Sequence, residues 1–190
     1  MTKYIFAQML YAPLSKNTSN ATNAMTGLKG IWLCALTVVT LIMSSMPVAA
    51  DGPVLLSVIN KSTDQTVHLT DKDLTSLPQQ SFETGTTWTE GTQTYQGPSL
   101  SSVLNLTGQV DAKAQIKFTA ANDYASIVSL DLISNQYPIV ANRIDGAEFS
   151  VRQKGPLWIM YPFDTFPDYK SESYFSAAAW QVIKIEIIPE

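Results

Sequence analysis

The sequence predicts an α+β fold: a single domain of mixed sheets with short helices and long loops, spanning residues 51–190. Three observations predict it. Short runs rich in β-branched residues alternate with short helical signals along the whole region. Neither an internal repeat nor a linker divides the region. The region holds 140 of the 190 residues, a length sufficient for one hydrophobic core.

The first fifty residues are expected to lie outside this domain. An apolar run, Ile31–Met43, follows Lys29 and precedes a small-residue segment that ends at Ala50. This is the pattern of a secretory signal peptide, with cleavage before Asp51. A membrane anchor is the alternative, but the run is shorter than the roughly 20 residues that a span needs. Because Met25 would itself begin a compact signal peptide, we expect translation to start there. We expect a periplasmic mature chain without a membrane span.

The composition of the mature region excludes several classes of protein. The region has no cysteine, because Cys34 lies inside the apolar run, so it offers neither a disulfide nor a thiolate metal ligand. It keeps nine basic and all 16 acidic residues. This acidic balance argues against a nucleic-acid partner, which needs clustered basic side chains. Its one histidine, His68, lies between apolar strand residues and is expected to be structural rather than catalytic.

The first half of the domain shows five elements. Thr70 and Asp73 form a capping box, which marks a helix start, and Pro98 suits a first helical turn. The elements are expected in this order: strands over 53–60 and 66–69, a short helix capped by Thr70 and ended by Pro78, a long polar loop with strand pieces over 81–95, and a helix opened by Gly97-Pro98 and capped by Gly108.

The second half continues with short strands and turns. Asp145-Gly146 is a strong hairpin signal, and the alternation of the last strand predicts Ile183, Ile185 and Ile187 on one face. The elements are expected in this order: a strand over 115–120, a turn at 122–124, a strand over 125–128, a short helix capped by Ser129, hairpin strands over 139–143 and 148–151, a buried strand over 157–161, a loop over 163–174, a helical turn over 176–180, and a strand over 182–188.

Three groups of side chains are candidates for chemistry or binding. Asp164, Asp168 and Glu172 crowd one loop, where carboxylates either do acid–base work, hold a hard cation or are simply solvated; their spacing matches no calcium loop. The basic group consists of Arg143, Arg152 and Lys154. These side chains either pair with Asp145, Glu148 and other acids or bind an anion. The aromatic candidates for a ligand cleft are Trp88, Tyr161, Phe163, Phe166 and Tyr169, whereas Trp158 is expected in the core.

Several segments, in their order and spacing, resemble a known family. They are Tyr95-Gln96-Gly97-Pro98-Ser99-Leu100, Asn122-Asp123-Tyr124, Ala141-Asn142-Arg143 with Asp145-Gly146, Arg152-Gln153-Lys154-Gly155-Pro156-Leu157-Trp158, Tyr161-Pro162 and Trp180. Together they resemble the molybdopterin-binding domain of sulfite-oxidase-type oxidoreductases, and best its short exported members, over about residues 54–188. The resemblance implies an α+β domain with mixed sheets and long cofactor-facing loops.

The resemblance also implies where a site would lie. Enzymes of this family hold molybdenum through one cysteine thiolate a few residues before a tryptophan. If Trp88 matches that tryptophan, Thr84 stands near the ligand position, and a hydroxyl is a poor substitute for a soft thiolate. The turn at 122–124 would lie near the cofactor mouth, and the basic group would hold the cofactor's phosphate and pterin. The candidate cleft therefore comprises Thr84, Trp88, Asn122, Asp123, Tyr124, Arg143, Arg152 and Lys154.

Two functions compete on these grounds. The first is a non-catalytic ligand-binding, accessory or sensory module, which takes a small molecule or an envelope protein in the cofactor cleft and needs no cofactor. The second is a molybdopterin-dependent oxidoreductase with an altered molybdenum site. A third, weaker hypothesis is a hydrolase or metal site built on Asp164, Asp168 and Glu172, which we call the late carboxylates. No catalytic residue is assigned, because the same fold hosts different functions.

Overall fold

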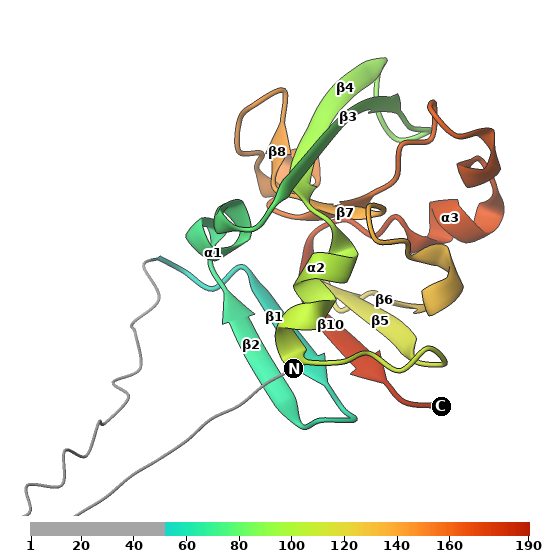
Figure 1. Ribbon diagram of the computed structural model, residues 1–190. Helices are drawn as coiled ribbons and strands as arrows, with labels where there is room; N and C mark the ends of the chain where they lie inside the picture. The colour runs from blue at the N-terminus through green and yellow to red at the C-terminus, as the bar shows by residue number, and fades with distance from the viewer. Residues whose placement is uncertain (1–51) are drawn as a thin grey trace, which may run out of the picture. The chain divides into compact units, whose positions relative to one another are not determined.

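The computed structural model describes residues 52–190, in which a five-stranded sheet lies at the bottom of Figure 1 and the β3–β4 hairpin at the top. The predicted start at Met25, the signal peptide and the cleavage before Asp51 lie outside the described residues and stay predictions. Among residues 52–190, no helix is long and apolar enough to cross a membrane.

The large sheet has the strand order β2-β1-β10-β5-β6. Strand β1 runs parallel to β10, and the other neighbours are antiparallel, so the sheet is mixed as predicted. Its inward side chains, such as Val58, Phe118 and Ile185, are at most 1% exposed. The strands are β1 (Leu56–Asn60), β2 (Gln65–Leu69), β5 (Gln115–Ala120), β6 (Ala125–Ser129) and β10 (Val182–Ile188).

Two smaller sheets complete the core. One has the order β3-β4-β8 and the other pairs β7 with β9. Strand β9 is fully buried, as its apolar sequence predicts, and Trp158 within it is 1% exposed. At Gly97 a Cβ would collide with the Val140 backbone, so this glycine lets β4 and β7 approach closely. The strands are β3 (Gln79–Gly85), β4 (Thr92–Pro98), β7 (Ile139–Ala141), β8 (Arg143–Ile144) and β9 (Trp158–Met160).

The helices are short, and side chains define their starts. The predicted capping box is confirmed: the Thr70 N–H donates to Asp73 Oδ2 at 2.8 Å, and the Asp73 N–H donates to Thr70 Oγ1 at 3.3 Å. Ser129 caps a 3₁₀ turn, as predicted. The helices are α1 (Asp71–Ser76), α2 (Leu100–Leu104) and α3 (Glu172–Ala177), with 3₁₀ turns η1 (Asn105–Thr107), η2 (Leu130–Leu132), η3 (Val151–Gln153) and η4 (Pro167–Tyr169).

Several predicted elements are wrong. Residues 81–95, expected as a long loop with strand pieces, form most of a hairpin, β3–β4, so the strand pieces are confirmed and the loop is shorter than expected. The polar strands lack the apolar alternation that marks a strand. Pro98 ends β4 instead of opening a helix, and Ser99 is the N-cap of α2, accepting from the Ser102 N–H at 3.2 Å. Residues 148–151 form no strand, because only Phe149 among them is buried. The helix expected over 176–180 begins at Glu172, within the expected loop.

The last strand contains a bulge that changes which side chains are buried. The pairing of β10 with β5 shifts register between Val182 and Lys184. Ile183 is therefore pushed outward and is 42% exposed, while Val182, Ile185 and Ile187 are buried. The prediction of a common face for Ile183 and Ile185 is wrong, because an extra residue in one strand interrupts the two-residue alternation. The mixed α+β fold class itself is confirmed.

Candidate functional site

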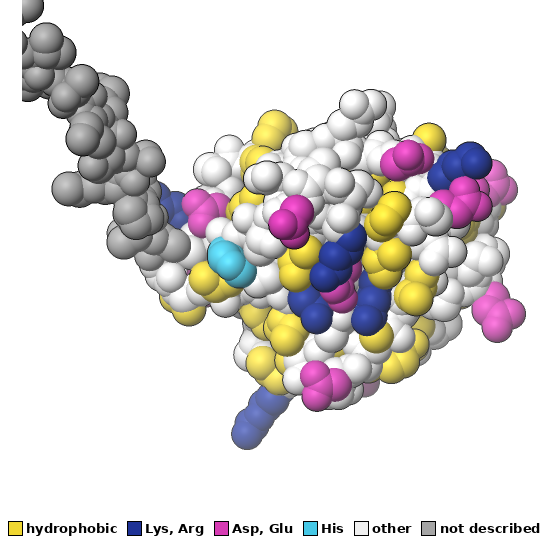
Figure 2. All heavy atoms as spheres, turned by 90° about the horizontal axis from the view of Figure 1, so that it is seen from below, with side chains coloured by type: hydrophobic (Ala, Val, Ile, Leu, Met, Phe, Trp, Pro, Cys, Tyr) yellow, Lys and Arg dark blue, Asp and Glu magenta, His cyan; other side chains and the backbone are white. Residues whose placement is uncertain are grey.

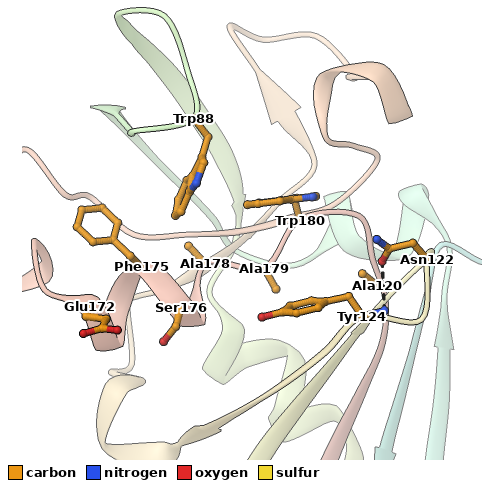
Figure 3. A pocket seen from close by; sticks show the side chains of 10 residues that line it. All are labelled: Trp88, Ala120, Asn122, Tyr124, Glu172, Phe175, Ser176, Ala178, Ala179 and Trp180. Atoms are coloured by element: carbon orange, nitrogen blue, oxygen red, sulfur yellow. Dashed lines mark hydrogen bonds between the residues drawn. The ribbon is translucent and has the colours of Figure 1, made fainter.

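A cleft of about 460 Å³, which we call the aromatic cleft, opens beside α3 (Figure 3). Its lining comes from four places in the chain: the β3–β4 loop, the β5–β6 turn, helix α3 and the segment that leads into β10. The lining residues are Trp88, Ala120, Asn122, Tyr124, Glu172, Phe175, Ser176, Ala178, Ala179 and Trp180.

Ring-to-ring contacts fix one wall of the cleft. The Trp88 ring meets Phe175 edge to face at a centroid distance of 5.8 Å and Trp180 at 5.4 Å. The β3–β4 loop holds Trp88 locally, since its N–H donates to Thr86 Oγ1 at 3.1 Å. Trp180 also meets the core ring of Trp158 at 6.1 Å. This wall is therefore anchored to the hydrophobic core.

The opposite wall is the turn that precedes β6. Asn122 Oδ1 accepts from the Tyr124 N–H at 3.2 Å, and Asp123 has a left-handed φ of 64°, so the predicted turn is confirmed. The turn presents Tyr124 with 59% of its surface exposed. In Figure 3 the Tyr124 and Trp180 rings lie on opposite sides of the cleft, with Ala179 between them. An exposed ring opposite a second ring is well placed to contact a bound apolar group.

Small side chains keep the space between the walls open. Ala120, Ala178 and Ala179 are all buried and project only a methyl group. Helix α3 adds polar groups at the edge: Glu172 and Ser176, of which the Ser176 hydroxyl donates to the Ser173 carbonyl at 2.8 Å. The cleft thus combines apolar walls with a few polar side chains, as ligand pockets generally do.

Lys154 supports the aromatic wall from behind. It has a left-handed φ of 71° after η3, and its Nζ donates to the Trp88 carbonyl at 3.3 Å. The same ammonium lies 5.8 Å from the ring centroids of both Trp158 and Trp180, which are cation–π contacts. The structure therefore places four of the eight candidate residues at this cleft: Trp88, Asn122 and Tyr124 in its lining, and Lys154 against its wall.

The other four candidates lie apart from the cleft lining. Asp123 is exposed in the turn itself, and Arg152 is exposed without an ion-pair partner among the described residues. Thr84 is buried, and its Oγ1 accepts from the Asp164 N–H at 3.2 Å. Its hydroxyl therefore joins β3 to the loop that follows β9.

Arg143 is bound to carboxylates and lines a different hollow with Asp71 and Glu148. Its two terminal nitrogens donate to Asp71 Oδ1 and Oδ2, each at 2.7 Å, and Glu148 lies 3.4 Å away. The hydrogen bond from Arg143 holds the pKa of Asp71 below its usual value. The predicted pairing with Glu148 is confirmed. The pairing with Asp145 is wrong, because Asp145 accepts from the Thr94 N–H at 2.9 Å instead.

The late carboxylates form no metal site. Among residues 52–190, no group of three or more His, Cys, Asp or Glu side chains is placed to hold an ion. Asp164 is held by the Gly85 N–H at 2.6 Å and by Lys170 at 2.8 Å, and these contacts lower its pKa. Glu172 borders the aromatic cleft instead. The exposed His68 hydrogen-bonds Ser57 at 3.0 Å, in keeping with its expected structural role.

Most of the other predicted cleft aromatics lie elsewhere. Tyr161 and Phe163 are at most 1% exposed and belong to the core. Phe166 and Tyr169 pack against each other at 5.5 Å and against Tyr137. Sequence reasoning missed Phe175, Ala178, Ala179 and Trp180 as cleft residues. A run of three alanines directly before a tryptophan was the available signal, because small residues beside a large ring leave space next to it.

The residues present do not fit a molybdenum cofactor. Residues 51–190 contain no cysteine, so the soft thiolate ligand is missing. The Thr84 hydroxyl, at the position that the resemblance suggests for the ligand, is engaged by Asp164. The three basic candidates do not converge: Arg143 binds Asp71, Arg152 is exposed, and Lys154 lies behind the tryptophans. An anionic cofactor would lack both its metal anchor and its cationic clamp.

Comparison with solved structures finds a similar fold. The fold resembles that of the sulfane dehydrogenase SoxCD from Paracoccus pantotrophus, with a TM-score of 0.55 and 15% sequence identity over 71% of this chain and 38% of that chain. The chain thus spans less than half the length of the protein it matches. At this identity the likeness shows the fold alone, and it agrees with the predicted α+β architecture. No family model and no curated protein matches the sequence.

Proposed function

We propose that this chain is an exported, non-catalytic ligand-binding module that holds a small, largely apolar ligand in the aromatic cleft. The observation that carries the proposal is the cleft itself: rings from four places in the chain line about 460 Å³ beside three alanines. Such a cavity is of the size that takes small organic ligands. The most exposed ring, Tyr124, lies where a ligand would cover it.

The chemistry of the lining suits binding rather than turnover. Glu172 is the one carboxylate of the lining, and no histidine or cysteine accompanies it. General acid–base catalysis requires a positioned pair of proton donor and acceptor, which this lining does not present. The aromatic walls supply apolar contact area, and Asn122 supplies a hydrogen-bonding amide at one end.

A second candidate is a molybdopterin-dependent oxidoreductase with an altered metal site. The fold likeness to a sulfane dehydrogenase is the observation that favours it. Against it stand the missing thiolate and the dispersed basic side chains. Under this alternative, purified protein would carry molybdenum in stoichiometric amount.

Fluorescence of N-phenyl-1-naphthylamine, an uncharged aromatic probe that avoids both Glu172 and the lysines, tests the proposed site. We expect saturable binding that falls about tenfold in affinity in Tyr124→Ala, because the exposed ring of this wall is lost. The unfolding free energy should change by less than about 0.5 kcal/mol, since the side chain is exposed.

Phe166→Ala is the matched control, because Phe166 is another exposed aromatic residue, at 43%, outside the cleft. It should leave probe binding within about twofold of the parent. Equal losses in the two variants, or unchanged binding in Tyr124→Ala, would place the probe elsewhere and contradict the assignment of the cleft.

A further inference from the structure

The outer face of the five-stranded sheet carries a cluster of lysines, which we call the lysine face. Alternation along β10 and β5 directs Lys184, Glu186 and Lys117 away from the core, and Lys61 follows the end of β1. These four residues define the lysine face. None of them lines the aromatic cleft. In Figure 2 this face shows basic side chains gathered around an acidic one, with hydrophobic side chains on both sides.

A single carboxylate holds the three ammonium groups together. Glu186 lies 3.2 Å from Lys61, 3.6 Å from Lys117 and 3.6 Å from Lys184. Its side chain is only 11% exposed, whereas the lysines are 50%, 35% and 38% exposed. Burial would raise the pKa of Glu186, but the hydrogen bond from Lys61 and the three positive charges outweigh it, so the pKa is lowered. Glu186 is therefore ionised, and the face keeps a surplus of two positive charges.

This surplus contrasts with the rest of the domain. The region 51–190 has 16 acidic and nine basic residues, and three of those nine lie on this one face. Each ammonium has three donor hydrogens, and one carboxylate cannot occupy them all. The face therefore has unused donors directed at solvent.

Exposed apolar side chains flank the lysines. Ile127, which is the cross-strand partner of Lys117, is 58% exposed, and Ile183 at the β10 bulge is 42% exposed. Apolar groups next to partly exposed charges are typical of protein interfaces, where a desolvated centre is surrounded by polar contacts. The outward positions of a sheet with one solvated face usually carry polar residues, so exposed isoleucines are unusual there.

We propose that the lysine face docks an acidic segment of a partner protein, one that carries glutamate or aspartate between apolar residues. The carboxylates would take the free lysine donors, and the apolar side chains would cover Ile127 and Ile183. Charge complementarity selects this occupant. An anionic membrane is disfavoured, because it attracts each basic residue by only about 1 kcal/mol and would repel the domain's acidic surplus.

Nuclear magnetic resonance titration with a short synthetic peptide that alternates glutamate with leucine tests the proposal. We expect the peptide to shift amide signals of β1, β5 and β10, and raising sodium chloride from about 50 mM to about 500 mM to weaken binding about tenfold. The double variant Lys117→Gln/Lys184→Gln should bind about tenfold more weakly. Lys61→Gln, at the edge of the cluster, serves if the double variant does not fold.

Two further variants decide between this site and general charge effects. Lys113→Gln/Lys170→Gln changes the net charge by the same amount but at two lysines outside the lysine face. Lys113 pairs with Glu190, and Lys170 pairs with Asp164. This variant should keep the parent affinity within about threefold. Glu186→Gln should bind the peptide more tightly, because it removes the only negative charge of the cluster.

Equal weakening in both double variants, weaker binding by Glu186→Gln, or signal changes confined to other elements would overturn the proposal. So would binding to phosphatidylglycerol vesicles without binding to the peptide, which would identify a membrane surface instead. Since the probe for the aromatic cleft is separate, either site can fail without the other.

Discussion

Individual side chains decide which predicted interactions exist. Arg143 was a candidate for anion binding, but Asp71 accepts from both of its terminal nitrogens. A guanidinium in a two-pronged contact with Asp71 and a further ion pair with Glu148 has little capacity left for an external anion. From the sequence, Asp71 could not be identified as the partner, because 72 positions separate the two residues.

This ion pair predicts a pH dependence of stability. The lowered pKa of Asp71 means that its contribution is complete above the ordinary value of 3.8 and is lost as the pH falls through the lower folded value. Asp71→Asn should therefore reduce the unfolding free energy by about 1 kcal/mol at about pH 7, with a difference that shrinks toward about pH 3.

Urea unfolding at several pH values measures this difference. Asp168→Asn is the control, because Asp168 is exposed and has no ion pair among the described residues. A deficit in Asp71→Asn that stayed constant down to about pH 3 would show that the carboxylate charge is not its cause.

At the scale of elements, the sequence predicted strands with apolar alternation and missed those without it. The strands over 115–120 and 157–161 were correct because their inward residues are apolar. The extent of the β3–β4 hairpin was missed because its strands are mostly Thr and Gln. The bulge in β10 was missed because its apolar residues alternate regularly in the sequence, and only the pairing with β5 interrupts them.

The bulge gives a direct test of the burial pattern. Ile185→Ala should destabilise the domain by about 2–4 kcal/mol, because it opens a cavity in the core. Ile183→Ala, two positions away, should cost less than about 0.5 kcal/mol. Denaturant unfolding of the two variants measures both values, and comparable costs would mean that the two side chains share a buried face.

At the scale of the whole molecule, the fold and the site were predictable to different degrees. The ordered family-like motifs led to the correct α+β architecture. Two of the cleft rings were among the residues used for that resemblance: Trp180 is one of its motifs, and Trp88 is the match suggested for the family's tryptophan. The cleft itself depends on contacts between segments far apart in the chain, such as Trp88 with Phe175. Local patterns cannot predict such contacts, because they report only on neighbouring residues.

The charge distribution is also a property of the whole molecule. An acidic domain concentrates a third of its basic side chains on one sheet face, around Glu186. The aromatic cleft, by contrast, is bordered by a carboxylate, Glu172. The lysine face is cationic, whereas the aromatic cleft is mainly apolar, so the two proposed sites differ in the chemistry of what each would bind.

We propose that this fold serves binding without a molybdenum cofactor. The most direct measurement is the molybdenum content, by mass spectrometry, of protein purified from the envelope of cells grown with molybdate. Far less than one atom per chain is expected, because residues 51–190 have neither a thiolate nor converging cationic side chains to retain the cofactor. A stoichiometric content of molybdenum together with pterin would contradict it and establish the oxidoreductase alternative.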